Sequence, residues 1–462
     1  MQPFAGGYRK GVCMSPSAAS SPRPRYAIVG LGGRAQMFVD ALTRAHVDTA
    51  QLVAFCDVNQ TRMDVHNRTV VERGLPAVAT YRAQDFGRML DAERVDTVIV
   101  TSIDRTHDEY IVAALRAGRD VITEKPMTTD AQRCRRILDV QAETGRKITV
   151  TFNYRYNPLH ARVREVIAAG AIGEIGSVHF EWLLDTRHGA DYFRRWHRDK
   201  ANSGGLMVHK ATHHFDLVNW WIASSPEVVY GLGRLFFYGD ENGNRRGIAR
   251  PYARAHGAPE AADDPFALKL ADNPTMTALY LDAEHEDGYH RDQNVFGPGI
   301  TIEDDMAVAV RYRSGATMSY HLTAYSPWEG YRVGFNGSAG RLELDVMENS
   351  FVDPGTAGTV AGEALHGRPG TEVRPEPERG ARLTLRKHWE KPEDLDLPDT
   401  SGGHGGGDER MLSDIFGGQP VEDPLGRAST HRDGALSLLT GLAANRSFET
   451  GLPVRADDIL EL

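Results

Sequence analysis

Short apolar runs alternate with longer amphipathic stretches between residues 25 and 150. Each run is apolar at successive positions, which is typical of a strand in a parallel sheet that helices cover on both faces. Between two of the runs, residues 105–117 place Ile111 and Leu115 at helical spacing, and Gly118 follows where a helix C-cap favours glycine. The pattern predicts a doubly wound domain over residues 25–150, with strands at residues 26–29, 51–55, 97–100, 120–123 and 147–150.

The pattern changes after residue 150. Alternating apolar and polar positions, separated by Ser-Gly, Pro and Gly-rich turns, indicate antiparallel strands at residues 177–184, 308–310, 316–320, 332–335 and 341–344. Helical spacing predicts helices at residues 157–169, 212–222, 408–416 and 429–446. A second, α+β domain is therefore expected over residues 151–462. Residues 239–301 and 348–379 exceed the usual loop length and are interpreted as covers over a site or as partly mobile insertions.

Composition and charge exclude several classes of protein. The chain has 462 residues, enough for two or three domains, and its net charge of -10 gives no basic surface for nucleic acid or an anionic membrane. This charge makes a small neutral or polar ligand the expected partner. No stretch of the sequence is apolar enough to span a membrane. The chain has three cysteines, an odd number with irregular spacing: Cys13, Cys56 and Cys134. This pattern favours a reducing compartment over a disulfide framework. Residues 1–24 lack a secretory signal and are expected to be a disordered tail of a cytoplasmic protein.

The residues after the first predicted strand follow the pattern G-x-G-x-x-A, with Gly30, Leu31, Gly32, Gly33, Arg34 and Ala35. In this pattern the first glycine permits a tight turn, the second lets the backbone approach a pyrophosphate, and the small last residue lets helix and strand pack closely. Asp57 ends the second strand 25 residues after Gly32, where a carboxylate binds ribose hydroxyls and disfavours a 2′-phosphate. NAD is therefore expected rather than NADP. A structural turn without cofactor and a surface role for Asp57 are the alternatives.

A later strand ends in Glu124, Lys125 and Pro126, at the edge where open α/β sheets bind their ligands. The chain resembles the Gfo/Idh/MocA oxidoreductase family. The motifs that carry the resemblance, over about residues 25–346, are residues 30–35, Asp57, residues 124–126, residues 152–158 and residues 204–216. The resemblance implies an α/β protein with an N-terminal NAD(P)-binding Rossmann domain. It also implies a C-terminal domain with a large, open, mostly antiparallel sheet, which often supports homodimers or homotetramers.

Members of this family usually oxidise or reduce a hydroxyl carbon of a sugar or cyclic polyol, so the resemblance gives Lys125 a role. Lys125 is expected to approach the nicotinamide ribose and the substrate hydroxyl, where its charge stabilises alkoxide character. Glu124 and Pro126 would lie beside the cofactor, and Glu124 would orient Lys125. A surface lysine before a turn and a structural acid at the strand end are the alternatives.

The segment at residues 204–216 carries the second half of the predicted site. His213 falls on the family's histidine, but His209 stands where family dehydrogenases commonly have an aspartate. His213 is therefore predicted to act as general base without its usual carboxylate, with His209 and Lys210 altering the proton transfer. A core position for His213 is one alternative. A metal held by His209 and His213 at i, i+4 is another, but no third ligand accompanies them, and no metal is expected.

Substrate contacts are expected from three other segments. Tyr154 and Arg155 follow a strand that passes from the first domain into the second, and Tyr154 is also a candidate for proton transfer or for core packing. Residues 185–196 are dense in rings and charges, as sugar-binding surfaces are, with the candidates Asp191, Tyr192 and Trp196. His404 lies in a glycine-rich loop before a predicted helix and is either a ligand contact or part of a linker.

Three functions fit these residues. The first is an NAD-dependent dehydrogenase that takes hydride from a ring hydroxyl carbon of a sugar, glycoside or cyclitol. The second, similar to another branch of the family, is a glycosidase that oxidises a ring hydroxyl transiently, eliminates the aglycone, adds water and recycles NAD. The third is a non-enzymatic NAD-sensing regulator, against which the presence of Lys125 and His213 argues.

Overall fold

The computed structural model of the chain describes residues 23–353, 380–398 and 405–462. The predicted tail at residues 1–24 and the stretch at residues 348–379 lie largely outside these described residues. No helix of the described part is both long and apolar enough to cross a membrane.

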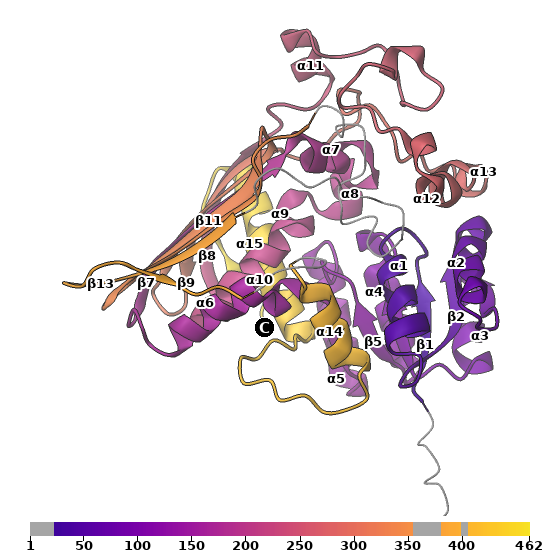
Figure 1. The fold of residues 1–462 in the computed structure, drawn as a ribbon, viewed down its shortest axis with the longest axis horizontal. Helices are drawn as coiled ribbons and strands as arrows, with labels where there is room; N and C mark the ends of the chain where they lie inside the picture. The colour runs from indigo at the N-terminus through magenta and orange to yellow at the C-terminus, as the bar shows by residue number, and fades with distance from the viewer. Residues whose placement is uncertain (1–22, 354–379, 399–404) are drawn as a thin grey trace, which may run out of the picture.

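The first domain is built on a six-stranded parallel sheet in the order β3-β2-β1-β4-β5-β6 (Figure 1). Residues of β1 show why the predicted runs are apolar throughout: Ala27 packs into the core on one face and Ile28 into the core on the other, and both are fully buried. The strands are β1 (Arg25–Val29), β2 (Gln51–Asp57), β3 (Ala79–Arg82), β4 (Thr97–Val100), β5 (Asp120–Thr123) and β6 (Ile148–Val150). The helices are α1 (Ala35–Asp40), α2 (Gln60–Glu72), α3 (Phe86–Ala92), α4 (His107–Arg116) and α5 (Ala131–Thr144).

The second domain holds a nine-stranded sheet in the order β14-β13-β12-β11-β7-β10-β9-β8-β15. Only the pair of β7 and β10 is parallel, so the predicted α/β fold with a second, mostly antiparallel sheet is confirmed. The strands are β7 (Ile175–Asp185), β8 (Pro226–Arg234), β9 (Asp305–Tyr312), β10 (Thr317–Ser326), β11 (Glu329–Gly337), β12 (Gly340–Asn349), β13 (Gly380–Lys387), β14 (Glu393–Leu395) and β15 (Val454–Arg455). The helices of this domain include α6 (Pro158–Ala168), α7 (Thr186–Arg194), α8 (Lys200–Ser203), α9 (Leu206–His209) and α10 (Ala211–Ile222). Helix α14 (Gly407–Phe416) packs instead on the core of the first domain.

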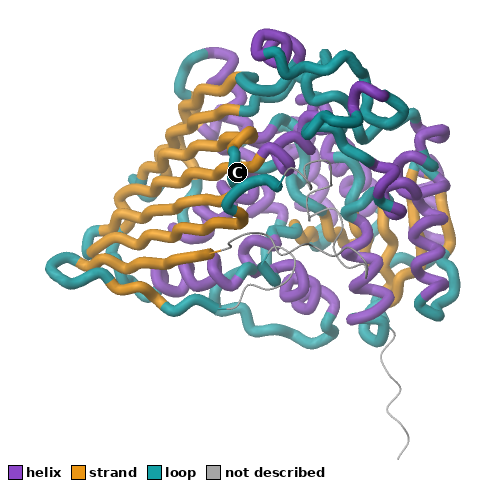
Figure 2. Tube along the Cα trace, turned by 45° about the horizontal axis from the view of Figure 1, so that its top comes forward, coloured by secondary structure: helices purple, strands orange, loops and turns teal. Residues whose placement is uncertain are grey.

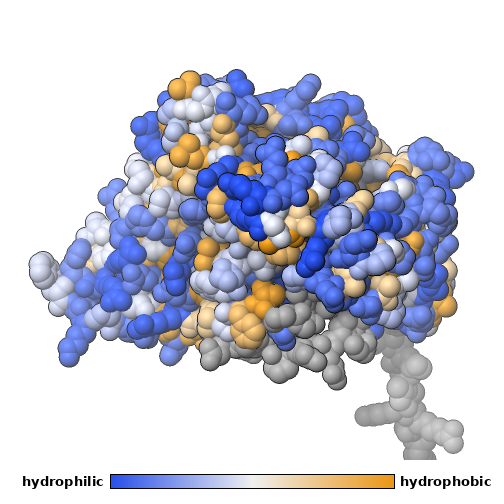
Figure 3. All heavy atoms as spheres, turned by 90° about the horizontal axis from the view of Figure 1, so that it is seen from above, coloured by the Kyte–Doolittle hydropathy of each residue, from blue (hydrophilic) through white to orange (hydrophobic). Residues whose placement is uncertain are grey.

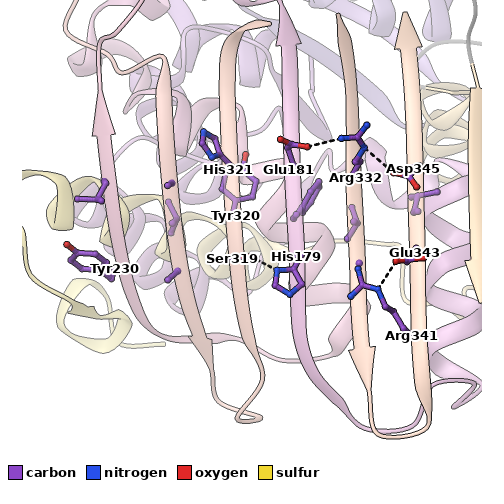
Figure 4. A pocket seen from close by; sticks show the side chains of 18 residues that line it. His179, Glu181, Tyr230, Ser319, Tyr320, His321, Arg332, Arg341, Glu343 and Asp345 are labelled. Atoms are coloured by element: carbon purple, nitrogen blue, oxygen red, sulfur yellow. Dashed lines mark hydrogen bonds and ion pairs between the residues drawn. The ribbon is translucent and has the colours of Figure 1, made fainter. Parts of the chain in front are cut away.

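The two faces of this second sheet differ. Along β9, buried and exposed residues alternate, because one face packs on helices and the other meets solvent. Figure 2 shows the strands side by side at one end of the molecule, with helices between them and the first domain. The exposed face is hollowed by about 670 Å³ and is lined by side chains of both charges (Figure 4).

A long C-terminal helix, α15 (His431–Thr450), joins the two domains. Its Leu438 belongs to the core of the first domain, while Ala443 belongs to the core of the second. The helix begins at His431 rather than at residue 429, because Thr430 and Asp433 form a capping box at its start. Through α15, one continuous helix fixes the position of the second sheet relative to the nucleotide-binding sheet.

The insertion at residues 239–301 forms short helical segments rather than strands. It contains α11 (Asp240–Arg246), α12 (Pro274–Met276) and α13 (Glu284–Asp287). In Figure 1 the chain crosses from the second sheet to lie over α2, on the far side of the first domain. The asparagine amide of Asn59, which caps α2, donates to the carbonyl oxygen of Ala283 at 2.8 Å, so the two segments are in direct contact.

Candidate active site

The glycine turn begins at the end of β1. Gly30 has a φ of 87°, and a Cβ atom there would lie 2.4 Å from the backbone of Ser102. Only glycine fits this position, because a side chain would be both strained and in collision with the neighbouring strand end. Gly32 is different, since the nearest atom to a Cβ built there is Tyr280 Oη at 3.8 Å. The backbone of the turn is therefore open at Gly32, which fits the close approach of a pyrophosphate.

Asp57 lies at the end of β2 and holds this turn in place. Its carboxylate accepts hydrogen bonds from the backbone N–H of Leu31 and, at 2.8 Å, from that of Asn59. Burial raises the pKa of Asp57, and the hydrogen bond from Leu31 and the charge of Arg62 oppose that rise. The predicted ribose-binding carboxylate thus lies against the glycine turn.

Arg34 and Glu124 connect the glycine turn with the end of β5. Arg34 Nε donates to Glu124 Oε1 at 2.9 Å, and its Nη2 lies 3.6 Å from Asp408 of α14. Ala35 is fully buried beneath the turn. The carboxylate of Glu124 is therefore fixed by an arginine of the nucleotide motif, beside Lys125 and Pro126.

Lys125 meets the second domain at His209. Its Nζ donates to the carbonyl oxygen of His209 at 3.3 Å, and the lysine side chain is half-buried. This places the predicted catalytic ammonium group at the carboxyl edge of the parallel sheet, against the end of α9.

His209 is paired with a carboxylate from the other domain. His209 Nδ1 lies 2.6 Å from Asp104 Oδ2, and both residues are buried. Burial raises the pKa of Asp104 well above its usual value, while the charges of Lys125 and Arg195 oppose that rise. Asp104 stands in the short 3-10 turn Asp104–Thr106 after β4, so the helix predicted from residue 105 begins as α4 at His107. Asp104 thus pairs a carboxylate with His209, the residue that stands four positions before His213.

Aromatic side chains of the predicted sugar-binding segment surround His209. The rings of Trp196 and His197 stack with their centroids 3.5 Å apart, and His197 lies 4.2 Å from the ring of His209. Burial and the nearby charges of His209 and Arg195 lower the pKa of His197 well below its usual value, so His197 is neutral at physiological pH. The ring centroids of Tyr192 and His209 are 5.6 Å apart, and the Tyr192 hydroxyl lies 3.1 Å from His188 Nε2.

His213, Tyr154 and Lys210 pack together and are buried. The rings of His213 and Tyr154 stack with centroids 4.2 Å apart, and Lys210 Nζ donates to Tyr154 Oη at 3.4 Å. His213 is 3% exposed and Lys210 2%. Their contacts are thus those of a packed aromatic and cationic cluster, and their catalytic roles stay predictions.

The remaining predicted residues lie in different surroundings. Arg155 forms buried ion pairs with Asp216 at 2.6 Å and Asp433 at 2.9 Å. Asp191 forms ion pairs with Arg195 at 2.8 Å and Arg291 at 3.2 Å. His404 lies outside the described residues. Among the described residues, no group of three or more His, Cys, Asp or Glu side chains is arranged to hold a metal ion.

The structure brings Lys125, His209, Tyr192 and Trp196 together, and it adds residues that the sequence reasoning missed. One signal for Asp104 was present, because Asp104 is a polar residue four positions after the end of β4, and the carboxyl ends of parallel strands form the ligand-binding edge. Tyr280 and Arg291 gave no comparable signal, since their contacts depend on how the insertion folds back. Arg195 and His197 lie in or next to the predicted sugar-binding segment, but neither was singled out there.

Comparisons with known proteins agree with this architecture. The family description "Oxidoreductase family, NAD-binding Rossmann fold" matches residues 24–152, and "Oxidoreductase family, C-terminal alpha/beta domain" matches residues 164–455. The oxidoreductase-family protein YteT of Bacillus subtilis (strain 168) is 34% identical over 452 residues, 94% of this chain and 98% of YteT. An inositol 2-dehydrogenase of Rubrobacter xylanophilus is 29% identical over 219 residues, 46% of this chain and 56% of that enzyme.

Solved structures share the fold at low sequence identity. The WlbA dehydrogenase from Bordetella pertussis, in complex with NADH and UDP-GlcNAcA, superposes with a TM-score of 0.60. Its sequence is 18% identical, and the match covers 96% of this chain and 100% of that one. At this identity the likeness concerns the fold alone.

Proposed function

Because the chain belongs to the Gfo/Idh/MocA oxidoreductase family, we propose that it is an NAD-dependent oxidoreductase acting on a ring hydroxyl of a sugar, glycoside or cyclitol. The observation that carries the proposal is the hydrogen bond from Lys125 to the backbone carbonyl of His209, whose imidazole is paired with Asp104 at the carboxyl edge of the parallel sheet. The similarity to an inositol 2-dehydrogenase supports a polyhydroxylated ring as the substrate class.

The residues of the first domain fit the cofactor. Gly32 and Gly33 would face the pyrophosphate, Asp57 the adenosine ribose, and Lys125 the nicotinamide ribose. NAD, when bound, supplies the acceptor for the hydride of the hydroxyl-bearing carbon. Glu124 is held by Arg34 and keeps the strand end beside Lys125 in a fixed position.

Lys125 and His209 would both act on the substrate hydroxyl. The ammonium group of Lys125 stabilises negative charge that develops on the hydroxyl oxygen. His209 accepts the hydroxyl proton at Nε2, because its Nδ1 is held by Asp104, and the carboxylate stabilises the imidazolium that forms. This geometry favours His209 over His213 as the general base, since the ring of His213 is stacked on Tyr154. Trp196 would pack on an apolar face of the sugar ring.

The preference for NAD over NADP can be tested at Asp57. The two arginines nearby are already paired, Arg62 with Asp287 at 2.6 Å and Arg82 with Glu286 at 2.8 Å. A 2′-phosphate would therefore meet the Asp57 carboxylate without a counter-charge. We expect NADH to bind at least about 100-fold more tightly than NADPH, and Asp57→Asn to reduce this ratio to about 10-fold or less, as measured by fluorescence titration.

The control for this experiment is Asp64→Asn, which removes an exposed carboxylate from the same helix, α2. The ratio should stay at its wild-type value in this variant. Equal or tighter binding of NADPH by the wild-type chain would refute the proposed preference.

We further propose that the chain forms a homodimer or homotetramer through the exposed face of its second sheet. On this face Arg332 lies 3.6 Å from Glu181 and 3.3 Å from Asp345, so neighbouring strands present paired charges (Figure 4). Leu232 of β8 is 60% exposed at the border of the same hollow. We expect Leu232→Glu to lower the mass in solution measured by light scattering, with Leu452→Glu, at another exposed leucine, as the control. A wild-type chain that is monomeric would contradict the proposal.

A further inference from the structure

Part of the 239–301 insertion packs on the first domain through a small hydrophobic core of its own. Val65 of α2 is 4% exposed and packs with the buried insertion residues Leu268, Leu270, Met276, Leu279 and Tyr280. Figure 3 looks down on the insertion, where hydrophilic side chains predominate on the outer surface. The apolar side of the insertion therefore faces the first domain.

Polar contacts hold the same segment over the start of α2. Glu286 accepts hydrogen bonds from the backbone N–H groups of Gln60 at 2.8 Å and Thr61 at 2.7 Å. Burial would raise the pKa of Glu286, but the hydrogen bonds from Thr61 and Gln60 lower it to about 2, so the carboxylate is charged at neutral pH. Because α2 begins shortly after Asp57, the insertion lies next to the expected position of the adenosine ribose.

The hydroxyl group of Tyr280, a residue of the insertion, contacts the glycine turn. The backbone N–H of Gly33 donates to Tyr280 Oη at 3.0 Å. The same oxygen is the nearest atom to a Cβ built at Gly32, at 3.8 Å. A residue outside the nucleotide motif thus reaches the two glycines that would contact a pyrophosphate.

Arginine side chains gather at Tyr280. Arg291 Cζ lies 4.8 Å from the centroid of the Tyr280 ring, and Arg62 Cζ lies 5.8 Å from it. Burial would raise the pKa of Tyr280, but the charges of Arg291 and Arg195 lower it. Arg291 is 1% exposed, and its Nε has no hydrogen-bond partner within the described part of the chain.

The cluster has more positive than negative charge. Arg195 and Arg291 both form ion pairs with the carboxylate of Asp191, at 2.8 Å and 3.2 Å. Arg194 is also 1% exposed, and its Nη1 is buried without a hydrogen-bond partner among the described residues. Buried guanidinium groups in excess of carboxylates are typical of a site that receives an anion.

We propose that Tyr280, Arg195 and Arg291 form a clamp that binds the pyrophosphate of the dinucleotide from the second domain. This inference rests on the proposed function and deepens it. The glycine turn faces the pyrophosphate from the first domain, Tyr280 and Arg291 contact it from the insertion, and Arg195 contacts it from the end of α7. Release of the dinucleotide then requires the insertion to separate from α2, so dissociation is slow.

The experiment measures binding of NADH, ADP-ribose and AMP to the full chain. Arg291→Gln should raise the Kd of NADH and of ADP-ribose by about 10- to 100-fold, and Tyr280→Phe by about 5-fold, because charge-assisted hydrogen bonds are lost. Displacement of NADH by excess ADP-ribose should become faster in both variants. AMP lacks a pyrophosphate and should bind all variants alike. Tyr289→Phe is the matched control, because its buried hydroxyl belongs to the same insertion and has no hydrogen-bond partner among the described residues.

The outcomes separate this inference from the proposed function. Unchanged NADH and ADP-ribose affinities in both variants would overturn the clamp while leaving the proposed function intact. A change confined to the KM of the substrate would also overturn it, because the arginines would then bind an anionic group of the substrate. A wild-type chain that binds neither NADH nor ADP-ribose would refute the proposed function and the clamp together. Tyr280→Phe keeps the test valid if Arg291→Gln fails to fold.

Discussion

His209→Ala should lower kcat/KM for oxidation of the sugar or cyclitol by about 1,000-fold. In the proposed function the imidazole of His209 accepts the hydroxyl proton, and Asp104 Oδ2, 2.6 Å from His209 Nδ1, would stabilise its charged form. The affinity for NADH should stay within about 3-fold of the wild type, because His209 lies outside the glycine turn. Initial rates followed by nicotinamide absorbance and an NADH titration measure the two quantities separately.

The control for this prediction is His256→Ala, which removes an exposed histidine of the insertion. Its rate should match the wild type. If His213→Ala abolishes turnover while His209→Ala retains it, the general base is His213, and the assignment made from the pair with Asp104 is wrong.

The pairing of Asp104 with His209 predicts that the oxidation rate depends on pH. The base must be unprotonated to accept a proton, so the oxidation rate should rise with pH as the His209 and Asp104 pair loses a proton. The carboxylate of Asp104 stabilises protonated His209, so Asp104→Asn should move the acid limb of the kcat/KM profile to lower pH. The rate at its plateau should fall by about 10- to 100-fold, because the charge that stabilises the imidazolium is lost. An acid limb that does not move would show that Asp104 has only a structural role.

Lys125→Met should lower kcat by about 100- to 1,000-fold. In the proposed function the ammonium group of Lys125 is the positive charge next to the substrate hydroxyl, and methionine keeps about the same side-chain length without the charge. Lys125 Nζ donates to the His209 carbonyl oxygen at 3.3 Å, and the substitution removes this hydrogen bond. Steady-state kinetics of the variant, with the pH profile, measure this effect.

Lys147→Met is the matched control, since Lys147 is exposed in the loop before β6 and lies on the same parallel sheet. Its kcat should equal that of the wild type. A Lys125→Met variant with an unchanged kcat would remove Lys125 from the mechanism.

The elements that could be predicted from the sequence are those whose residue pattern depends on local burial. The apolar runs of the first domain became strands because their side chains enter cores on both faces, as Ala27 and Ile28 do. The glycine turn was also predictable, because the φ of Gly30 and its distance from Ser102 leave no room for another residue. In these cases the chemistry of a few neighbouring residues decides the structure.

Contacts between distant segments could not be predicted in the same way. Asp104 and His209 are 105 positions apart, and they meet only because α9 of the second domain docks at the edge of the first sheet. The carboxylate that pairs with His209 therefore comes from a residue outside the family's motifs. The contact of Tyr280 with Gly33, across 247 positions, depends on the insertion in the same manner.

The most direct test of the proposed function supplies the purified chain with NAD and a panel of free sugars, cyclitols and chromogenic glycosides. Reduced nicotinamide and released aglycone are recorded together in each reaction. The proposed function predicts that reduced nicotinamide forms in proportion to a free sugar or cyclitol consumed, and that His209→Ala loses this activity. Release of aglycone that requires NAD but leaves no net reduced nicotinamide would contradict the proposal and would identify a glycosidase instead.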